Sequence, residues 1–107
     1  METFATIRLE ELRSLILPVL EPFGVEEIAL FGSTVRGEET MESDLDVLVR
    51  FQDPPCKPLG LLTWGRLERE LAARCGKKVD LVSARGLNRH LRPLVEAEKV
   101  VLYAQAG

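Results

Sequence analysis

The sequence predicts an α/β fold in which a mixed β-sheet of about four strands is packed by helices. Short runs of β-branched and aromatic residues alternate with segments of helical periodicity, which is the pattern of an α/β sandwich. Of the 107 residues, 46% are hydrophobic and 29% are charged, a balance that supplies a core. No repeat, low-complexity tract or linker divides the chain, so we expect a single domain over residues 1–107.

The N-terminal half predicts one helix and two strands. Apolar residues recur at helical spacing over 7–22, where Thr6 is a plausible N-cap and Pro18 should kink or end the helix in its last turn. The runs "EEIALF" (26–31) and "LDVLVRF" (45–51) predict strands. The short connection between these two strands allows them to be antiparallel, and we therefore expect a mixed sheet.

The C-terminal half continues the alternation. Gly76 is a suitable C-cap for the helix that precedes it, and Pro93 is tolerated in the last helix only if that helix starts late or bends. The expected elements are a loop with three prolines over 52–58, a helix over 59–74, a strand over 78–83, a helix over 86–98 and a strand over 99–104.

Composition excludes several classes of protein. The net charge of −3 at pH 7 argues against a nucleic-acid-coating protein, which must neutralise phosphates. Cys56 and Cys75 lie far apart and His90 is the single histidine, so the chain has no zinc motif. The N-terminus resembles neither a signal nor a transit peptide, and no apolar run is long enough for a membrane span. We therefore expect a cytoplasmic protein without a membrane partner.

Two aspartates interrupt the apolar pattern in "LFGSTVRGEETMESDLDVLVRF", residues 30–51. Side chains alternate along a strand, so Asp44 and Asp46 point to one face while Leu45 and Val47 point to the other. Two carboxylates on one side repel each other unless a cation lies between them. Mg²⁺ takes oxygen ligands and commonly keeps phosphates in its remaining positions, so the pair predicts a metal-bound polyphosphate.

The stretch "GSTVRG" supplies the second half of this interpretation. Gly32 permits close approach of a phosphate, and Ser33 can donate through its hydroxyl and its amide. We expect the backbone N–H groups of this turn to be open toward the ligand. Arg36 could neutralise a phosphate oxygen, and Gly37 would let the chain turn back toward the second strand.

A third carboxylate, Asp80, lies in the apolar run "KVDLVS". If the third strand pairs beside the second, Asp80 can join Asp44 and Asp46 around two metal ions. One ion would grip a triphosphate and the other would activate the attacking hydroxyl. This hypothesis depends on a strand pairing that the sequence does not show.

The motif resembles the signature of the DNA polymerase β nucleotidyltransferase superfamily. Gly32-Ser33 is followed, after ten residues, by the Asp-Leu-Asp triplet at 44–46, and the wording is most similar to the minimal nucleotidyltransferases, the MNT group. The resemblance runs from about residue 8 to 103 and implies a polymerase-β-like fold.

The resemblance also implies roles for individual residues. The Gly-Ser pair would hold the nucleotide phosphates, the paired aspartates would bind Mg²⁺, and the third strand would add another carboxylate. These roles fall on Gly32, Ser33, Asp44, Asp46 and Asp80, and Arg36 matches the arginine of the Gly-Ser-x-x-Arg-Gly stretch. ATP is the nucleotide that the resemblance favours.

MNT proteins commonly pair with a small helical HEPN toxin, and some transfer AMP from ATP to a tyrosine of that toxin. The resemblance therefore implies an Mg²⁺-dependent nucleotidyltransferase acting as an antitoxin. Two alternatives remain: a non-catalytic module that neutralises a partner by complex formation, and an enzyme that adds nucleotides to an RNA end. The acidic charge counts against the RNA alternative.

Other residues have simpler interpretations. His90 is expected on the surface of a helix, and no histidine is needed as a general base. Trp64, Leu67 and Leu71 are expected in the core, whereas the stretch "LGLLTW" (59–64) is where a partner-binding apolar patch would lie.

A small basic cluster stands near the C-terminus. Arg85, Arg89 and Arg92 are at near-helical spacing, and they form either a solvated face or a contact for an acidic partner or RNA.

Overall fold

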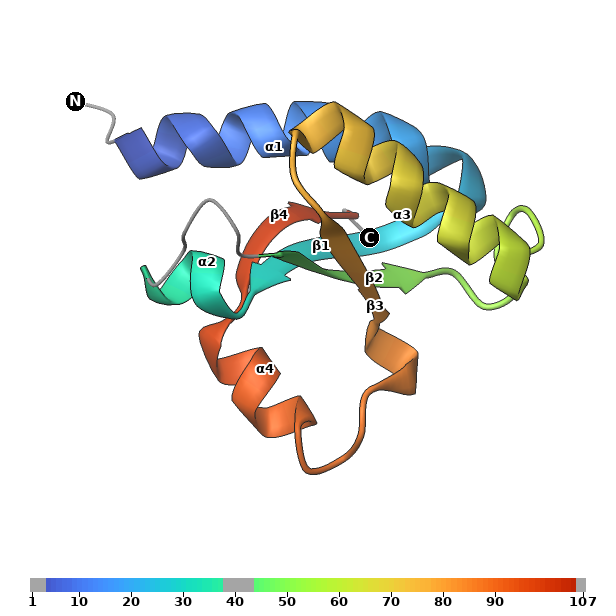
Figure 1. Ribbon diagram of the computed structural model, residues 1–107. Helices are drawn as coiled ribbons and strands as arrows, with labels where there is room; N and C mark the ends of the chain where they lie inside the picture. The colour runs from blue at the N-terminus through green and yellow to red at the C-terminus, as the bar shows by residue number, and fades with distance from the viewer. Residues whose placement is uncertain (1–3, 38–43, 106–107) are drawn as a thin grey trace.

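A four-stranded sheet forms the middle layer of the computed structural model, which describes residues 4–37 and 44–105. Helices α1 (Phe4–Leu20) and α3 (Leu61–Cys75) cover one face, and the short helix α4 (Arg92–Glu98) lies against the other (Figure 1). The strands are β1 (Val25–Phe31), β2 (Leu45–Phe51), β3 (Val79–Ser83) and β4 (Val100–Ala104).

The strands lie in the order β3-β2-β1-β4. β1 pairs antiparallel with both β2 and β4, whereas β2 pairs in parallel with β3 through the α3 crossover. The expected mixed sheet, with its first two strands antiparallel, is therefore confirmed. The parallel pairing of β2 with β3 also meets the condition on which the role of Asp80 depends.

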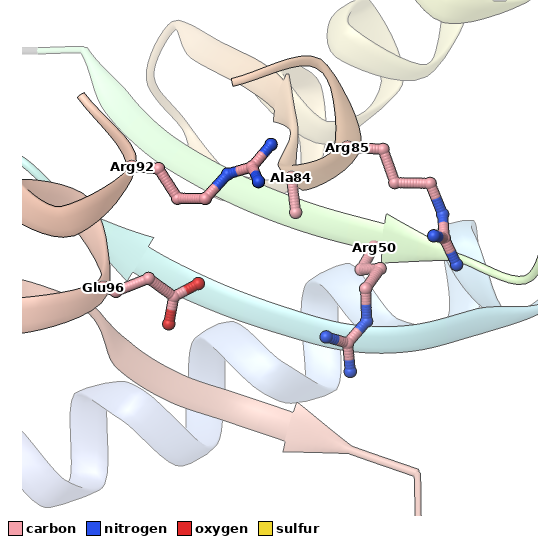
Figure 2. A pocket seen from close by; sticks show the side chains of 5 residues that line it. All are labelled: Arg50, Ala84, Arg85, Arg92 and Glu96. Carbon is pink, nitrogen blue, oxygen red and sulfur yellow. The ribbon is translucent and has the colours of Figure 1, made fainter. Parts of the chain in front are cut away.

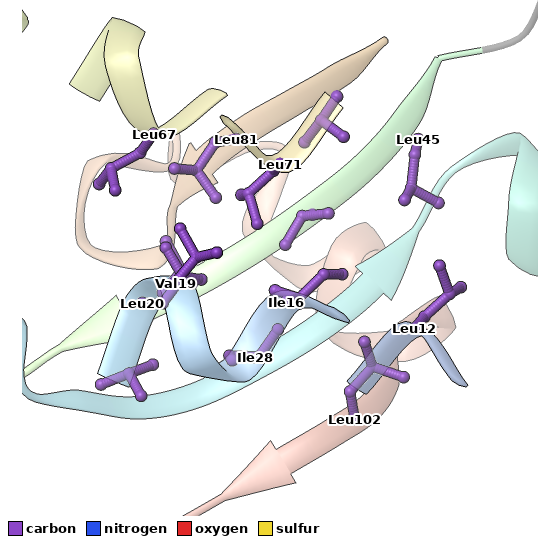
Figure 3. Packing of buried hydrophobic residues seen from close by; sticks show 14 of the residues in the cluster. Leu12, Ile16, Val19, Leu20, Ile28, Leu45, Leu67, Leu71, Leu81 and Leu102 are labelled. Carbon is purple, nitrogen blue, oxygen red and sulfur yellow. The ribbon is translucent and has the colours of Figure 1, made fainter. Parts of the chain in front are cut away.

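The main core lies between the sheet and the helices α1 and α3. Alternation along β2 turns Leu45, Val47 and Val49 toward these helices, where all three are fully buried. Ile16 of α1 and Leu71 of α3 belong to the same buried cluster and are also fully buried (Figure 3). A smaller apolar cluster of Ala29, Leu48 and Val95 holds α4 to the opposite face.

Most predicted boundaries are close to those observed. β2 has the predicted bounds, and β1 and β3 differ from them by one residue at the start. α1 begins at Phe4 rather than at residue 7 and ends two residues after Pro18. Gly76 closes α3 in the left-handed conformation, as predicted for a C-cap.

The helix predicted over 86–98 was too long. Only its second half is helical: α4 begins at Arg92, and Pro93 lies in its first turn, where the missing N–H has no helical partner to lose. A 3₁₀ turn (Ala84–Gly86) and a loop occupy the rest of the interval after β3. His90 is exposed as expected, but it lies in a turn before α4 and not on a helix.

Within the described ranges, the structure contains no helix that is both long and apolar enough to cross a membrane.

Candidate active site

A tight turn at the end of β1 forms one wall of the site. Gly32 has φ 78° and ψ −150°, a conformation that disfavours any side chain. Its carbonyl accepts the N–H groups of Val35 and Arg36, both at 3.2 Å, and so begins the helical turn α2 (Ser33–Arg36). A Cβ at Gly32 would collide with the Asp46 carboxylate. The glycine therefore lets the carboxylate lie directly against the turn.

The aspartates of β2 and β3 come together across the sheet. Asp46 and Asp80 are direct partners in the parallel register, so their side chains share one face. Asp46 is also opposite Phe31, the last residue of β1, which places it beside the turn. Asp44 precedes β2, and its Oδ2 lies 3.8 Å from the Nζ of Lys78.

The charges of the site act on Asp46. Burial raises the pKa of the Asp46 carboxyl, and the negative charges of Asp80 and Asp44 raise it further. The Arg36 guanidinium opposes this effect, whereas the Glu98 carboxylate adds to it. An additional positive charge beside Asp46 would therefore relieve an unfavourable concentration of negative charge.

Glu98, the last residue of α4, is a member of the site that the sequence analysis missed. Its Oε1 accepts the N–H of Gly32 at 2.9 Å, and both of its oxygens lie 3.2 Å from Nη1 of Arg36. The Gly32 hydrogen bond is the largest effect on the pKa of Glu98 and lowers it; burial opposes this, and the hydrogen bond and charge of Arg36 lower the pKa further. The expectation that the amides of the turn are open is thus wrong for Gly32, and Arg36 already has an anionic partner.

No local signal could have revealed this contact, because Glu98 is 66 residues from Gly32 in the sequence. The same helix carries a second acidic residue, the exposed Glu96, and only the tertiary arrangement distinguishes Glu98 from it.

The acidic residues fit a divalent cation in an open site. Among the residues that the structure describes, there is no group of three or more histidine, cysteine or acidic side chains that could hold a metal ion. Mg²⁺ does not require one, since it usually binds one or two carboxylates and keeps water or phosphate oxygens elsewhere. Burial and then the charges of Asp80 and Asp44 raise the pKa of Asp46, and a cation beside Asp46 would offset both effects.

Comparison with known proteins agrees with this geometry. The family model of the nucleotidyltransferase domain matches residues 12–103. The chain belongs to this nucleotidyltransferase family. The protein adenylyltransferase MntA of Thermococcus cleftensis is 40% identical over 100 residues, which cover 90% of this chain and 97% of the relative.

Solved structures show the same architecture. A protein described as a minimal nucleotidyltransferase is 36% identical, with a TM-score of 0.70 and coverage of 88% of this chain and 92% of the other. A chain from a toxin–antitoxin structure with AMP-PNP is 25% identical, with a TM-score of 0.72 and coverage of 87% and 73%. The protein is therefore an enzyme of the nucleotidyltransferase class, and the predicted polymerase-β-like fold is confirmed.

The predicted basic cluster of this nucleotidyltransferase does not form one helical face. Arg85 lies in the 3₁₀ turn, Arg89 in the following turn and Arg92 at the start of α4. Arg85 Nη2 lies 3.4 Å from Glu26 and 3.2 Å from the carbonyl oxygen of Phe51, so this arginine fastens the turn to the sheet.

An open pocket of about 350 Å³ lies between α4 and the adjacent part of β2. Figure 2 shows its lining, in which Arg92 and Glu96 of α4 lie across from Arg50 of β2 and Arg85 of the 3₁₀ turn. Its lining residues are Arg50, Ala84, Arg85, Arg92 and Glu96.

The stretch 59–64 contains the start of α3 at Leu61, and its most exposed side chains are apolar, as predicted. Leu61 and Leu62 are 93% and 91% exposed. Trp64 is partly buried, and its Nε1 donates to the carbonyl oxygen of Leu81 at 3.0 Å. Leu67, one turn further along the helix, is buried in the core, as is Leu71.

Proposed function

We propose that this nucleotidyltransferase transfers AMP from ATP to a hydroxyl group of a partner protein and thereby acts as an antitoxin. The observation that supports this most directly is the meeting of Asp46 and Asp80 across β2 and β3, beside the turn at Gly32. Carboxylates arranged next to a glycine turn suit a nucleoside triphosphate and its cations.

In this proposal the residues of the turn hold the phosphates. Ser33 donates its amide and its hydroxyl to phosphate oxygens, while Gly32 keeps the backbone close. Arg36 is 46% exposed, so its guanidinium has a solvent-facing side from which to contact a phosphate.

The three aspartates would hold Mg²⁺, with two ions in the complete site. Bound Mg²⁺ supplies neutralisation of the triphosphate charge and a lower pKa for the attacking hydroxyl. The carboxylates that would hold the ions come from two adjacent strands, since Asp44 and Asp46 lie at the start of β2 and Asp80 in β3. Asp80 is exposed and can also accept the proton that the hydroxyl loses.

The transfer itself is a displacement at the α-phosphorus of ATP. The hydroxyl oxygen of the acceptor forms a bond to this phosphorus, the bond to the bridging oxygen breaks, and pyrophosphate leaves. The chain contributes by orienting the reacting groups, since little covalent chemistry is required of the protein.

The acceptor that we propose is a tyrosine of a small helical toxin of the HEPN type. The relative from Thermococcus cleftensis is named a protein adenylyltransferase, which supports a protein acceptor. The neighbour solved with AMP-PNP is described as a toxin–antitoxin, which supports both an adenine nucleotide and a toxin partner. Leu61 and Leu62 provide exposed apolar surface of the kind that a stable protein partner covers.

A labelling experiment tests the proposal. The purified protein is incubated with α-phosphate-labelled ATP, Mg²⁺ and a lysate of its source organism, beside the Asp44→Asn/Asp46→Asn double variant. Asp53→Asn serves as a matched control, because Asp53 is an exposed loop residue. Label on a protease-sensitive band, made by the wild type and the control alone, supports the proposal.

Two other results would contradict it. Label that ribonuclease removes would identify an RNA end as the acceptor. Capture of a small helical protein without label, at equal strength by the wild type and the double variant, would identify a non-catalytic binding module.

A further inference from the structure

The contact between Glu98 and the turn at Gly32 joins two distant parts of the chain. Glu98 ends α4 just before β4 begins, and the turn ends β1 at the same end of the antiparallel β1–β4 pair, where Leu30 lies opposite Val100. Oε1 of Glu98 accepts the Gly32 N–H at 2.9 Å, and both of its oxygens lie 3.2 Å from Arg36 Nη1. The Glu98 carboxylate therefore restrains both the Gly32 peptide and the Arg36 guanidinium of the proposed phosphate-binding turn.

The position of Gly32 is fixed from two sides. The Asp46 carboxylate fills the space where a side chain would be, and Glu98 holds the N–H. The Gly32 carbonyl is also used, because it begins the helical turn α2. The direction of the next peptide, which carries the amide of Ser33, follows from these restraints.

Glu98 differs from the aspartates of the site in what its oxygens contact. Its oxygens accept hydrogen bonds from an amide and a guanidinium, so they are already engaged by donors. A carboxylate that is satisfied in this way is suited to orienting the turn and poorly suited to binding a cation.

We propose that Glu98 is a positioning residue for the nucleoside triphosphate. It holds the Gly32 peptide and the Arg36 guanidinium in the orientation in which Ser33 and Arg36 meet the phosphates. The inference rests on the proposed function, because it assigns the turn to the triphosphate. Small displacements of such groups have large effects on the rate, since reacting groups must be aligned to within about 1 Å.

Two variants separate the contacts of Glu98. Glu98→Gln keeps a carbonyl oxygen for the Gly32 N–H but loses the charge that pairs with Arg36. Glu98→Ala loses both interactions. Glu96→Ala is the matched control, because Glu96 lies on the same helix and pairs with Lys99 outside the turn.

The first measurement is the dissociation constant of a fluorescent ATP analogue, taken with Mg²⁺ and again with a chelator. We expect Glu98→Ala to weaken binding by about tenfold, the size of a lost charge-assisted hydrogen bond, under both conditions. Glu98→Gln should fall between this variant and the wild type, and Glu96→Ala should bind like the wild type. Thermal melting identifies any variant that is unfolded. If Glu98→Ala is unfolded, the affinity of Glu98→Gln for the ATP analogue is the deciding measurement.

Steady-state kinetics add a second readout. Glu98→Ala should raise KM for ATP and also lower kcat, because the phosphates bind more weakly and in poorer alignment. In an Arg36→Ala background, the further loss caused by Glu98→Ala should shrink, since part of its effect passes through Arg36.

Two outcomes would overturn the inference. Unchanged binding and kinetics in Glu98→Ala would show that the contact only stabilises the fold. Tighter nucleotide binding in Glu98→Ala would show that Glu98 competes with the phosphates for the turn. Failure of the proposed function is distinguishable from both, because it would show in the wild type itself, which would fail to bind the ATP analogue or would label an acceptor other than a protein.

Discussion

The two faces of β2 differ in what they contribute to the molecule. On one face Leu45, Val47 and Val49 are fully buried beneath α1 and α3. On the other, Asp46 is partly exposed and Arg50 is 46% exposed, because the short helix α4 covers only part of the sheet. Successive residues of β2 point to opposite faces, so neighbouring positions contribute either to the core or to the candidate site. Substitutions on the two faces should therefore fail in different ways.

The largest effect is expected on the polar face. Asp46→Asn should lower the transfer rate on the order of a thousandfold, since it removes a carboxylate from the centre of the proposed metal site. Its melting temperature should not fall, because the raised pKa of Asp46 shows that the ionised carboxylate is unfavourable in the folded state. Initial rates and thermal melting check the two statements. A large loss of stability would remove the contrast between the faces.

A substitution in the core that packs against the apolar face of β2 should have the opposite profile. Leu71→Ala leaves a cavity beneath α3 and should lower the free energy of unfolding by about 2–5 kcal/mol, with normal transfer per folded molecule. Leu61→Ala on the same helix is the control, because Leu61 is 93% exposed and its loss should cost less than about 0.5 kcal/mol. Urea unfolding monitored by circular dichroism measures both, and equal effects would contradict the assigned core.

A smaller effect concerns the ion pairs at the junction of α4 and β4. Burial alone would lower the pKa of Lys99, but Glu27 and Glu96, at 2.6 Å and 2.8 Å from its Nζ, raise it above 10.5 overall. The stabilisation is complete below the unfolded pKa and is lost as the pH rises through the higher folded pKa. Near pH 9, the free energy of unfolding of the wild type should be greater than that of Lys99→Met by at most about 1 kcal/mol.

The comparison is made by urea unfolding of both proteins near pH 9 and again near pH 11. The difference in the free energy of unfolding should shrink at the higher pH, because the unfolded chain then loses the Lys99 proton and the stabilisation declines as the pH rises toward the raised folded pKa. A difference that is constant or grows with pH would show that the Lys99 side chain acts through its aliphatic packing.

The smallest effect is a difference in thiol reactivity. Burial raises the pKa of the Cys75 thiol at the end of α3 more than the nearby Arg74 lowers it. Cys56 lies exposed in the proline-rich loop. Iodoacetamide should therefore modify Cys56 several-fold faster than Cys75 near pH 8, because the thiolate is the reactive form. Peptide mass spectrometry of a time course would show the order, and the reverse order would contradict the packing of Cys75.

The sequence predicted the parts of the fold that local pattern determines. The bounds of β2 were predicted correctly because the run "LDVLVRF" is rich in β-branched and apolar residues and is soon followed by the proline pair at 54–55. The last helix was predicted six residues too early, because a turn with polar and apolar residues at helical spacing imitates a helix. Pro93 was the residue that indicated the later start, since proline favours the first turn of a helix over its interior.

The candidate site was predictable in its motif but not in its tertiary contacts. Gly32, Ser33, Asp44, Asp46 and Asp80 were identified from spacing and resemblance, and the structure brings Asp46 and Asp80 into register. Their catalytic and metal-binding roles remain predictions. Glu98 was missed because its hydrogen-bond partner, Gly32, is 66 residues away in the sequence. The same contact occupies the Gly32 amide, which was expected to be open.

The Gly32–Glu98 hydrogen bond has a consequence for the order in which the molecule is made. During synthesis the three aspartates leave the ribosome well before α4, and β2 and β3 can already pair. The phosphate-binding turn gains its restraint only when the chain has reached residue 98 and a contact of 66 residues' separation has closed. A nascent or truncated chain that lacks α4 would then contain the three aspartates but not the Glu98 contact that restrains the turn at Gly32.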